Sequence, residues 1–70
     1  MAEHLQISMA AARVNAGLTQ AEVAEMMEVS NKTILNWEKG KVRPRAAQLH
    51  LFCEIVGIDQ NNIFLPEKET

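Results

Sequence analysis

The segment from Asn31 to Lys39, "NKTILNWEK", carries side chains suited to directional contacts with another molecule. In a helix, successive residues turn by about 100°, so several of these side chains fall within one arc of roughly 140°. That arc holds two amides, two ammonium groups and a leucine, namely Asn31, Leu35, Lys39, Lys32 and Asn36. Ile34 and Trp37 fall on the opposite side. The spacing therefore predicts a helix with one packed face and one face available for recognition.

Each side chain on that arc has a use against double-stranded DNA. An Asn amide can bond N6 and N7 of adenine together, and a Lys can reach guanine O6 or N7, or a phosphate. A leucine offers apolar contact to the methyl group of thymine. The helix N-terminus and its Ser30 cap supply amide donors for phosphate oxygens. Taken singly, exposed Asn and Lys residues are more often only solvated, and Leu35 could belong to the core or to a protein contact.

The charge of the chain is unevenly distributed, although the total is only −2. Residues 32–45 hold five cations and one anion, a net charge of +4, so the rest of the chain carries −6. The five cations are Lys32, Lys39, Lys41, Arg43 and Arg45. A basic patch of this kind can steer a protein towards a polyanion in spite of an acidic total.

Two short helices are predicted to follow one another almost without a break. Thr19 and Glu22 fit a capping box that begins a helix over residues 20–27. Ser30 would cap a helix over residues 31–39. Because only two residues join these helices, they must cross at a large angle, as in a helix-turn-helix.

Three further helices complete the predicted fold. Ser8 would cap a helix over residues 9–16, and Pro44 precedes an apolar helical pattern over residues 46–56. Asp59 would cap a last turn over residues 60–64. The sequence thus predicts an all-α, compact five-helix domain.

Length and composition fit one small domain. A chain of 70 residues with 47% apolar but only 4% aromatic residues favours an aliphatic helical core. We expect a single domain over residues 1–70, with a core of about 8–65 and flexible ends at 1–7 and 66–70. No apolar run approaches the ~20 residues that span a bilayer. The first residues, "MAEHLQ", have neither a basic nor an apolar stretch, so we expect no signal peptide. A cytoplasmic, nucleoid-associated protein without membrane contact is therefore expected.

Catalytic chemistry has no residues to support it. The only cysteine, Cys53, can form no internal disulfide, and its helical setting favours a small buried hydrophobe. No cluster of His, Cys, Asp or Glu at metal-ligand spacing is present, and no phosphate loop or nucleophile elbow. We therefore expect no enzyme, no metal and no cofactor.

The segment "ARVNAGLTQAEVAEMMEVSNKTILNWEKGKVRPR" closely resembles the repressor/Cro, or Xre-like, family of helix-turn-helix domains, of phage or prophage type. The matching motifs are Arg13, "AGLTQAEVA", "VSNKTI", "WEKGK" and Pro44. The later stretch "EIVGIDQNNIF" is also similar to the last two helices of that family. The resemblance covers about residues 8–64. It implies a five-helix, lambda-repressor-like domain that binds operator DNA, usually as a dimer, with the third helix in the major groove.

The resemblance also implies roles for single residues. Positions that match the base-reading residues of the family are Asn31, Lys32 and Asn36, to which the helical arc adds Leu35. Positions expected at the DNA backbone are Gln20, Ser30, Thr33, Lys39, Lys41 and Arg43. Arg13 and Glu38 match a pair that, in relatives, forms an ion pair between the first and third helices.

Two positions depart from the family pattern. Glu28 stands at the turn position that is commonly Gly, and a non-Gly residue at positive φ costs roughly 1 kcal/mol. Either the turn is strained or its conformation has changed. Leu35 stands in the middle of the reading face, where many relatives have a polar or small residue. We expect it to contact a thymine methyl group.

Two functions of different class remain open. The first is a sequence-specific transcriptional regulator, most simply a Cro-like repressor, bound to a pseudo-palindromic operator with half-sites about 34 Å apart. A homodimer would form through the apolar residues of the C-terminal segment, Ile58, Ile63, Phe64 and Leu65. Seventy residues leave no room for a ligand-sensing domain, so no small-molecule ligand is expected. The chain is then either the whole protein, which Met1 and the short charged tail favour, or a fragment of a longer repressor.

The second function is a protein-interaction module that kept the fold, of anti-repressor or antitoxin-like kind. The net acidity of the chain and the exposed position expected for Leu35 favour it. Salt dependence separates the two functions, because contacts with phosphates release counterions and contacts with a protein need not.

Overall fold

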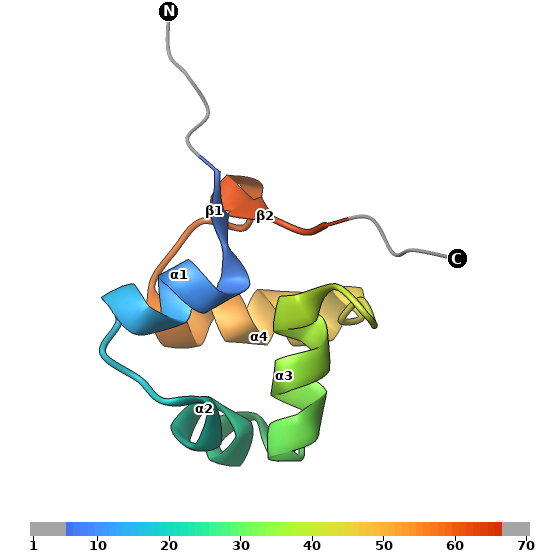
Figure 1. Ribbon diagram of the computed structural model, residues 1–70. Coiled ribbons are helices and arrows are strands. Elements are labelled where there is room, and N and C mark those ends of the chain that lie inside the picture. Colours follow the sequence, from blue (N-terminus) through green and yellow to red (C-terminus); the bar gives the residue numbers. More distant parts are fainter. Residues whose placement is uncertain (1–5, 67–70) are drawn as a thin grey trace, which may run out of the picture.

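Four α-helices, a short 3-10 helix and two very short strands make up residues 6–66, the part of the chain that the computed structural model describes (Figure 1). In chain order these are β1 (Ile7–Ser8), α1 (Met9–Asn15), α2 (Gln20–Met27), α3 (Asn31–Lys39), α4 (Ala46–Val56), the 3-10 helix η1 (Gln60–Asn62) and β2 (Ile63–Phe64). The predicted helical fold with a helix-turn-helix is confirmed, apart from its fifth helix.

Hydroxyl side chains begin the first two helices as predicted. Ser8 Oγ accepts from the Ala11 amide at 3.0 Å at the start of α1. At α2, Thr19 Oγ1 accepts from the Glu22 amide at 3.0 Å, and Glu22 Oε1 accepts from the Thr19 amide at 2.8 Å. This reciprocal pair completes the capping box and satisfies two amides that a helix N-terminus otherwise leaves unpaired.

The turn between α2 and α3 depends on two residues. Glu28 ends α2 in the left-handed conformation, with φ 59° and ψ 41°. Within the described range it is the one non-glycine residue with a positive φ. Ser30 then caps α3, because its Oγ accepts from the Thr33 amide at 3.0 Å. The turn therefore keeps the conformation that Gly usually adopts, and it carries the strain of a Cβ atom.

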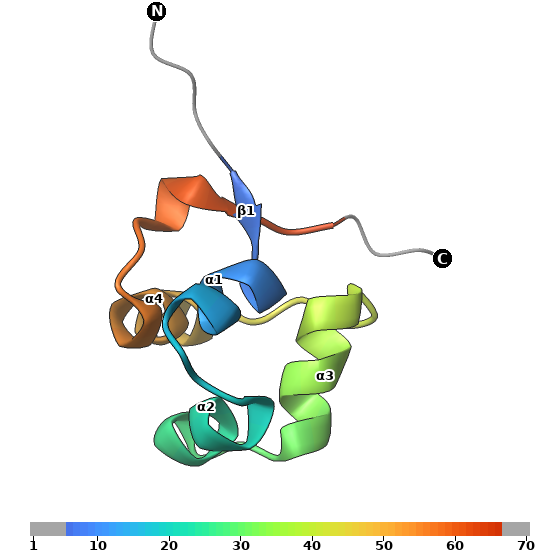
Figure 2. The same ribbon diagram turned by 60° about the vertical axis from the view of Figure 1, so that its left-hand side comes forward.

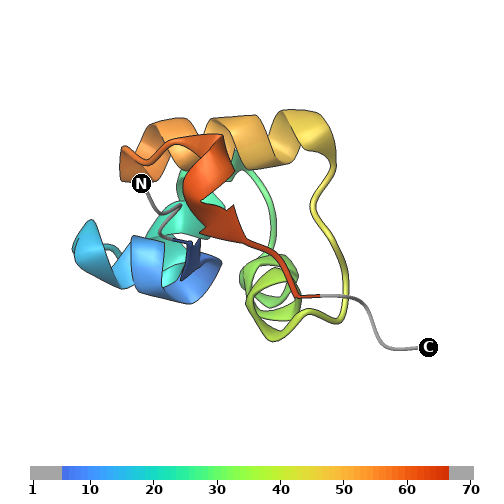
Figure 3. The same cartoon turned by 90° about the horizontal axis from the view of Figure 1, so that it is seen from above.

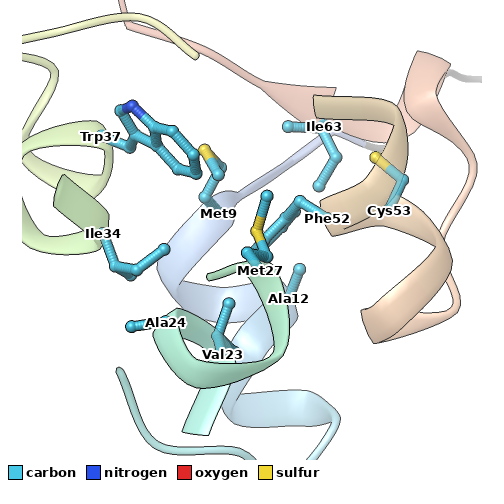
Figure 4. Close-up of a cluster of buried hydrophobic side chains, with 10 residues drawn as sticks. All are labelled: Met9, Ala12, Val23, Ala24, Met27, Ile34, Trp37, Phe52, Cys53 and Ile63. Atoms are coloured by element: carbon cyan, nitrogen blue, oxygen red, sulfur yellow. The ribbon is translucent and has the colours of Figure 1, made fainter. Parts of the chain in front are cut away.

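The core lies where all four α-helices meet, and Figure 4 shows its side chains converging from each of them. Phe52 of α4, Met9 of α1, Ile34 of α3 and Val23 of α2 are its largest fully buried members. The remaining buried residues are Ala12, Ala24, Met27, Trp37, Cys53 and Ile63. α3 is thus fixed through the side that bears Ile34 and Trp37, which leaves its other side free to face outward.

The fifth helix is the part of the fold where the prediction was wrong. Asp59 does cap a turn, since its Oδ1 accepts from the Asn61 amide at 2.8 Å, but this turn is a 3-10 helix of three residues. Beyond it the chain becomes extended, and Ile63–Phe64 pair in parallel with Ile7–Ser8. The backbone groups of β2 are satisfied by a strand from the other end of the chain, so a fifth α-helix does not form.

The same pairing alters two expectations for the chain ends. Ile7, placed in the flexible segment 1–7, stands opposite Ile63 in the sheet. The other residues expected to be flexible lie mostly outside the described range. Ile63, expected to contact a second copy, has its side chain only 6% exposed within the core, so it cannot contribute to a dimer surface. Phe64 points the other way and is 49% exposed, as alternation along a strand requires.

The strands and α2 lie at opposite ends of the molecule (Figure 2). Seen from above, α4 and α3 lie on opposite sides, and the chain after β2 runs towards the end of α3 (Figure 3). Contact there is close: a Cβ atom added to Gly40 would stand 2.8 Å from Cγ of Pro66. Pro66 therefore lies against the end of α3, and within residues 6–66 the α3 face away from the core keeps exposed residues such as Asn31 and Lys32.

Candidate nucleic-acid interface

The outward face of α3 carries the predicted base-reading residues. Asn31 and Lys32 are exposed, and Asn36 is half-buried. Within residues 6–66, none of these three side chains has a hydrogen bond or an ion pair with the rest of the chain. Their donors and acceptors are available to a partner. The buried positions of Ile34 and Trp37, at 0% and 3% exposure, determine which way this face points.

Leu35 lies in the middle of that face. It is half-buried, but it is not among the partly buried hydrophobic side chains that pack against the core. Leu35 therefore presents an apolar surface between polar side chains, which suits a methyl group of a base or an apolar group of another protein.

The predicted phosphate-contacting cations form an exposed series that continues from α3. Lys39 lies in the last turn of the helix, and Lys41 and Arg43 lie in the loop that follows. Arg45, at the start of α4, is also exposed and extends the series. Among the described residues none of these cations is paired with a carboxylate. Their charge is therefore available to phosphate groups.

The N-terminus of α3 combines two hydroxyl groups. Besides capping the helix, Ser30 Oγ lies 2.9 Å from Thr33 Oγ1, so one hydroxyl donates to the other. One O–H group of the pair is therefore left for a further acceptor. The positive end of the helix dipole lies at the same place. Ser30 and Thr33 together can donate to a phosphate oxygen.

A polar network ties α3 to α1 and α2 behind the reading face. Arg13 Nε donates to Glu38 Oε2 at 2.7 Å, and Arg13 Nη1 donates to the Leu18 carbonyl at 2.9 Å. Gln20 Nε2 donates to Glu38 Oε1 at 2.9 Å. The side chains of Arg13 and Glu38 are only 15% and 6% exposed. Glu38 thus accepts from the first two helices at once while it belongs to the third.

The contact between Gln20 and Glu38 was missed by the sequence analysis, which placed Gln20 at the DNA backbone. The two residues are 18 positions apart, and only the packing of α2 against α3 brings them together. No local pattern could have indicated it. The contact occupies one N–H of the Gln20 amide and leaves its other N–H and its carbonyl oxygen for a partner.

Gln20 and Asn31 line the same open hollow, of about 610 Å³, at the start of α2. Arg13 lines it from the side of α1. The hollow joins the polar network to the first base-reading position of α3. It is open towards solvent, so it can receive part of a large partner.

Residues 6–66 lack two other kinds of feature, a metal-binding cluster and a membrane-spanning helix. No group of three or more His, Cys, Asp or Glu side chains could hold a metal ion there. No helix in that range is both long enough and apolar enough to cross a membrane. Cys53 is buried in the core, and its burial, with the nearby Asp59 carboxylate, raises the pKa of the thiol above its ordinary value. Its thiol is therefore protonated at neutral pH.

Comparison with known protein families gives one match. A family model described as helix-turn-helix matches residues 9–59, which cover α1 to α4 and the turn that follows. Comparisons with curated proteins and with solved structures gave no match. The matched range contains the whole reading face, the cationic series and the polar network.

Proposed function

Because the chain belongs to the helix-turn-helix family of DNA-binding regulators, we propose that it is a sequence-specific transcriptional repressor of the Cro-like, phage or prophage type. In this proposal α3 lies in the major groove of a pseudo-palindromic operator and the protein acts at the nucleoid in the cytoplasm. The observation that carries the proposal is the free polar face of α3, fixed from behind by the core. Asn31, Lys32 and Asn36 have no partner of their own within the described residues.

Base contacts and backbone contacts are proposed for different parts of the surface. Asn31, Lys32 and Asn36 would contact base edges, because their groups are free and converge on one side of the helix. Leu35 would contact a thymine methyl group. Substitution of Leu35 by Ala should then weaken binding only where that thymine is present. An equal loss on every duplex would argue against the contact.

The backbone contacts would come from the ends of α2 and α3. The remaining O–H of the Ser30–Thr33 pair would donate to one phosphate, and the exposed cations Lys39, Lys41 and Arg43 to others. Gln20 would donate its remaining N–H to a phosphate or a base at the start of α2. These groups fix the position of α3 on the duplex and carry no sequence information directly.

We propose a homodimer, with a contact centred on Phe64 in place of the buried Ile63. Phe64 is 49% exposed, and Leu65 beside it is half-buried. Phe64→Ser should shift a dimer to a monomer in sedimentation equilibrium while thermal unfolding stays cooperative. A wild-type chain that is monomeric at high concentration, both free and on DNA, would contradict this part of the proposal.

A salt titration tests the function itself. Each phosphate that is neutralised should contribute a slope of about −0.9 to a plot of log affinity against log salt. With several cations engaged, the affinity should fall steeply between low and moderate salt. A flat slope, or no affinity for duplex DNA, would favour the alternative, in which the face around Leu35 binds a protein.

A further inference from the structure

We propose that Glu38 is a positioning residue for DNA recognition, which sets the orientation of the Gln20 side-chain amide. This inference rests on the proposed function and deepens it. It starts from the hydrogen bond between Gln20 Nε2 and Glu38 Oε1, at 2.9 Å. The shortest contact of the ion pair, from Arg13 Nε, goes to the other carboxylate oxygen, Oε2, at 2.7 Å. Arg13 Nη2 also donates to Oε1, but over a longer distance of 3.4 Å.

The orientation of the Gln20 amide follows from the chemistry of its partner. A carboxylate only accepts hydrogen bonds, so the NH₂ group of Gln20, and not its carbonyl oxygen, must face Glu38. An exposed glutamine could turn its amide over to suit any ligand. Gln20 is half-buried, and Glu38 is 6% exposed and held by Arg13 at 2.7 Å, so this amide is held in one orientation.

The residue that bears the held amide lies beside the reading surface. Gln20 lines the open hollow together with Asn31, the first predicted base-reading residue. In the wild-type orientation one N–H and the carbonyl oxygen of Gln20 remain available to that hollow. The carbonyl can accept from an amide or from the amino group of a base, and the N–H can donate to a phosphate. In this proposal Glu38 sets the direction of the free N–H and of the carbonyl oxygen of Gln20, although Glu38 does not itself contact DNA.

The substitution Glu38→Gln should reverse this orientation. The oxygen of the substituted side chain would have to accept from Arg13, because a guanidinium group can only donate. The introduced NH₂ group would then take the place of Oε1. It would lose the 3.4 Å contact from Arg13 Nη2, and it would require the carbonyl oxygen of Gln20, its nearer neighbour at 2.9 Å. The Gln20 amide would turn over and change the groups that it offers to DNA. The packing volume at this position of α3 would be almost unchanged.

A double-mutant cycle on DNA binding tests the proposal. We expect Glu38→Gln and Gln20→Leu each to raise Kd for the preferred duplex by about tenfold, the scale of one lost hydrogen bond. The double variant should bind within about twofold of Gln20→Leu alone, because both substitutions remove the same contact. Additive effects, about a hundredfold in the double variant, would contradict the proposal, as would an unchanged Kd for Glu38→Gln.

Two controls separate positioning from stability. All Kd values are measured at a temperature at which each variant is fully folded, as determined by thermal unfolding. Phe52→Leu, in the core and outside the polar network, should lower stability and leave Kd within about threefold. If Phe52→Leu raises Kd as much as Glu38→Gln does, the effect belongs to stability and the proposal is wrong.

The failure of this proposal can be told apart from failure of the proposed function. The cycle uses a duplex selected by the wild-type protein from random sequences. If the wild-type protein selects no sequence, the function as a specific regulator fails. If the wild-type protein selects a sequence but the effects of Glu38→Gln and Gln20→Leu are additive, the proposed function stands and the proposed role of Glu38 is wrong.

Discussion

Arg13 of α1 and Glu38 of α3 lie 2.7 Å apart, Nε to Oε2, behind the face of α3 that points away from the protein. The contact links the first helix to the last turn of the third. Glu38 is an anion at a helix C-terminus, where the dipole disfavours negative charge, so it needs a cation nearby. Arg13 supplies that charge and also donates to the Leu18 carbonyl.

Removal of Arg13 should destabilise the fold. Arg13→Ala leaves one carboxylate oxygen of a largely buried Glu38 without its main donor, at a cost of about 1–3 kcal/mol. Urea unfolding followed by far-UV circular dichroism measures the change. A loss below about 0.5 kcal/mol would mean that solvent replaces the guanidinium group, as at an exposed surface pair.

Substitution of Glu28 by Gly should stabilise the protein. Glu28 has φ 59°, a region that is costly for a residue with a Cβ atom and free of strain for Gly. We expect a gain of about 0.5–1 kcal/mol in the free energy of unfolding, measured by urea denaturation. The matched control is Glu25→Gly, at an exposed position within α2, which should lose about 1 kcal/mol. A loss for Glu28→Gly would show that the turn carries no strain at this position.

Features confined to one helix could be predicted from the sequence. Helix starts were predicted at Ser8, Thr19 and Ser30 because a cap and its amide lie three residues apart. The burial of Ile34 and Trp37 followed from helical periodicity. The outward face of α3 therefore follows from the sequence once the segment is known to be a helix.

Features that join distant segments were not predictable in the same way. The prediction of a fifth helix was wrong because Ile63 and Phe64 pair with Ile7 and Ser8. No local sequence signal marks a pairing between two segments so far apart in the chain. The prediction that Ile63 belongs to a dimer surface was wrong for the same reason, because the strand pairing places Ile63 in the core. The contact from α2 to Glu38 required the relative placement of α2 and α3, which capping signals do not give.

Base-reading and phosphate-contacting residues should respond differently to substitution. Asn36→Ala should cost about 1–3 kcal/mol of binding free energy on the preferred duplex and relax the preference at one base pair. Lys41→Ala is the matched contrast: it should weaken binding to all duplexes alike and reduce the salt slope by about one. Kd values on single-base variants of the duplex, each at several salt concentrations, measure both effects. If Asn36→Ala weakens binding to all duplexes equally, Asn36 contacts the DNA backbone and not a base.

The buried thiol should make stability depend on pH at the alkaline end. Burial raises the pKa of Cys53 from its ordinary value of 9.0, and the Asp59 carboxylate adds to the effect. The folded state therefore disfavours the thiolate, so the contribution is fully present below pH 9.0 and is lost as the pH rises above it.

Unfolding by urea at about pH 8 and about pH 10 should show the loss in the wild-type protein. The Cys53→Val variant, which keeps an apolar side chain at the position, should lose less over the same interval. An equal loss in both proteins would show that the alkaline destabilisation does not come from Cys53.

The most direct measurement of the central claim is a selection from random double-stranded DNA, carried out with the wild-type protein and with an Asn31→Ala, Asn36→Ala variant. The wild-type protein should enrich a pseudo-palindromic sequence with half-sites about one helical turn apart. The variant should still retain DNA through its cations but lose the enriched bases. If the wild-type protein enriches no sequence, or the variant enriches the same one, the face from Asn31 to Asn36 does not read DNA.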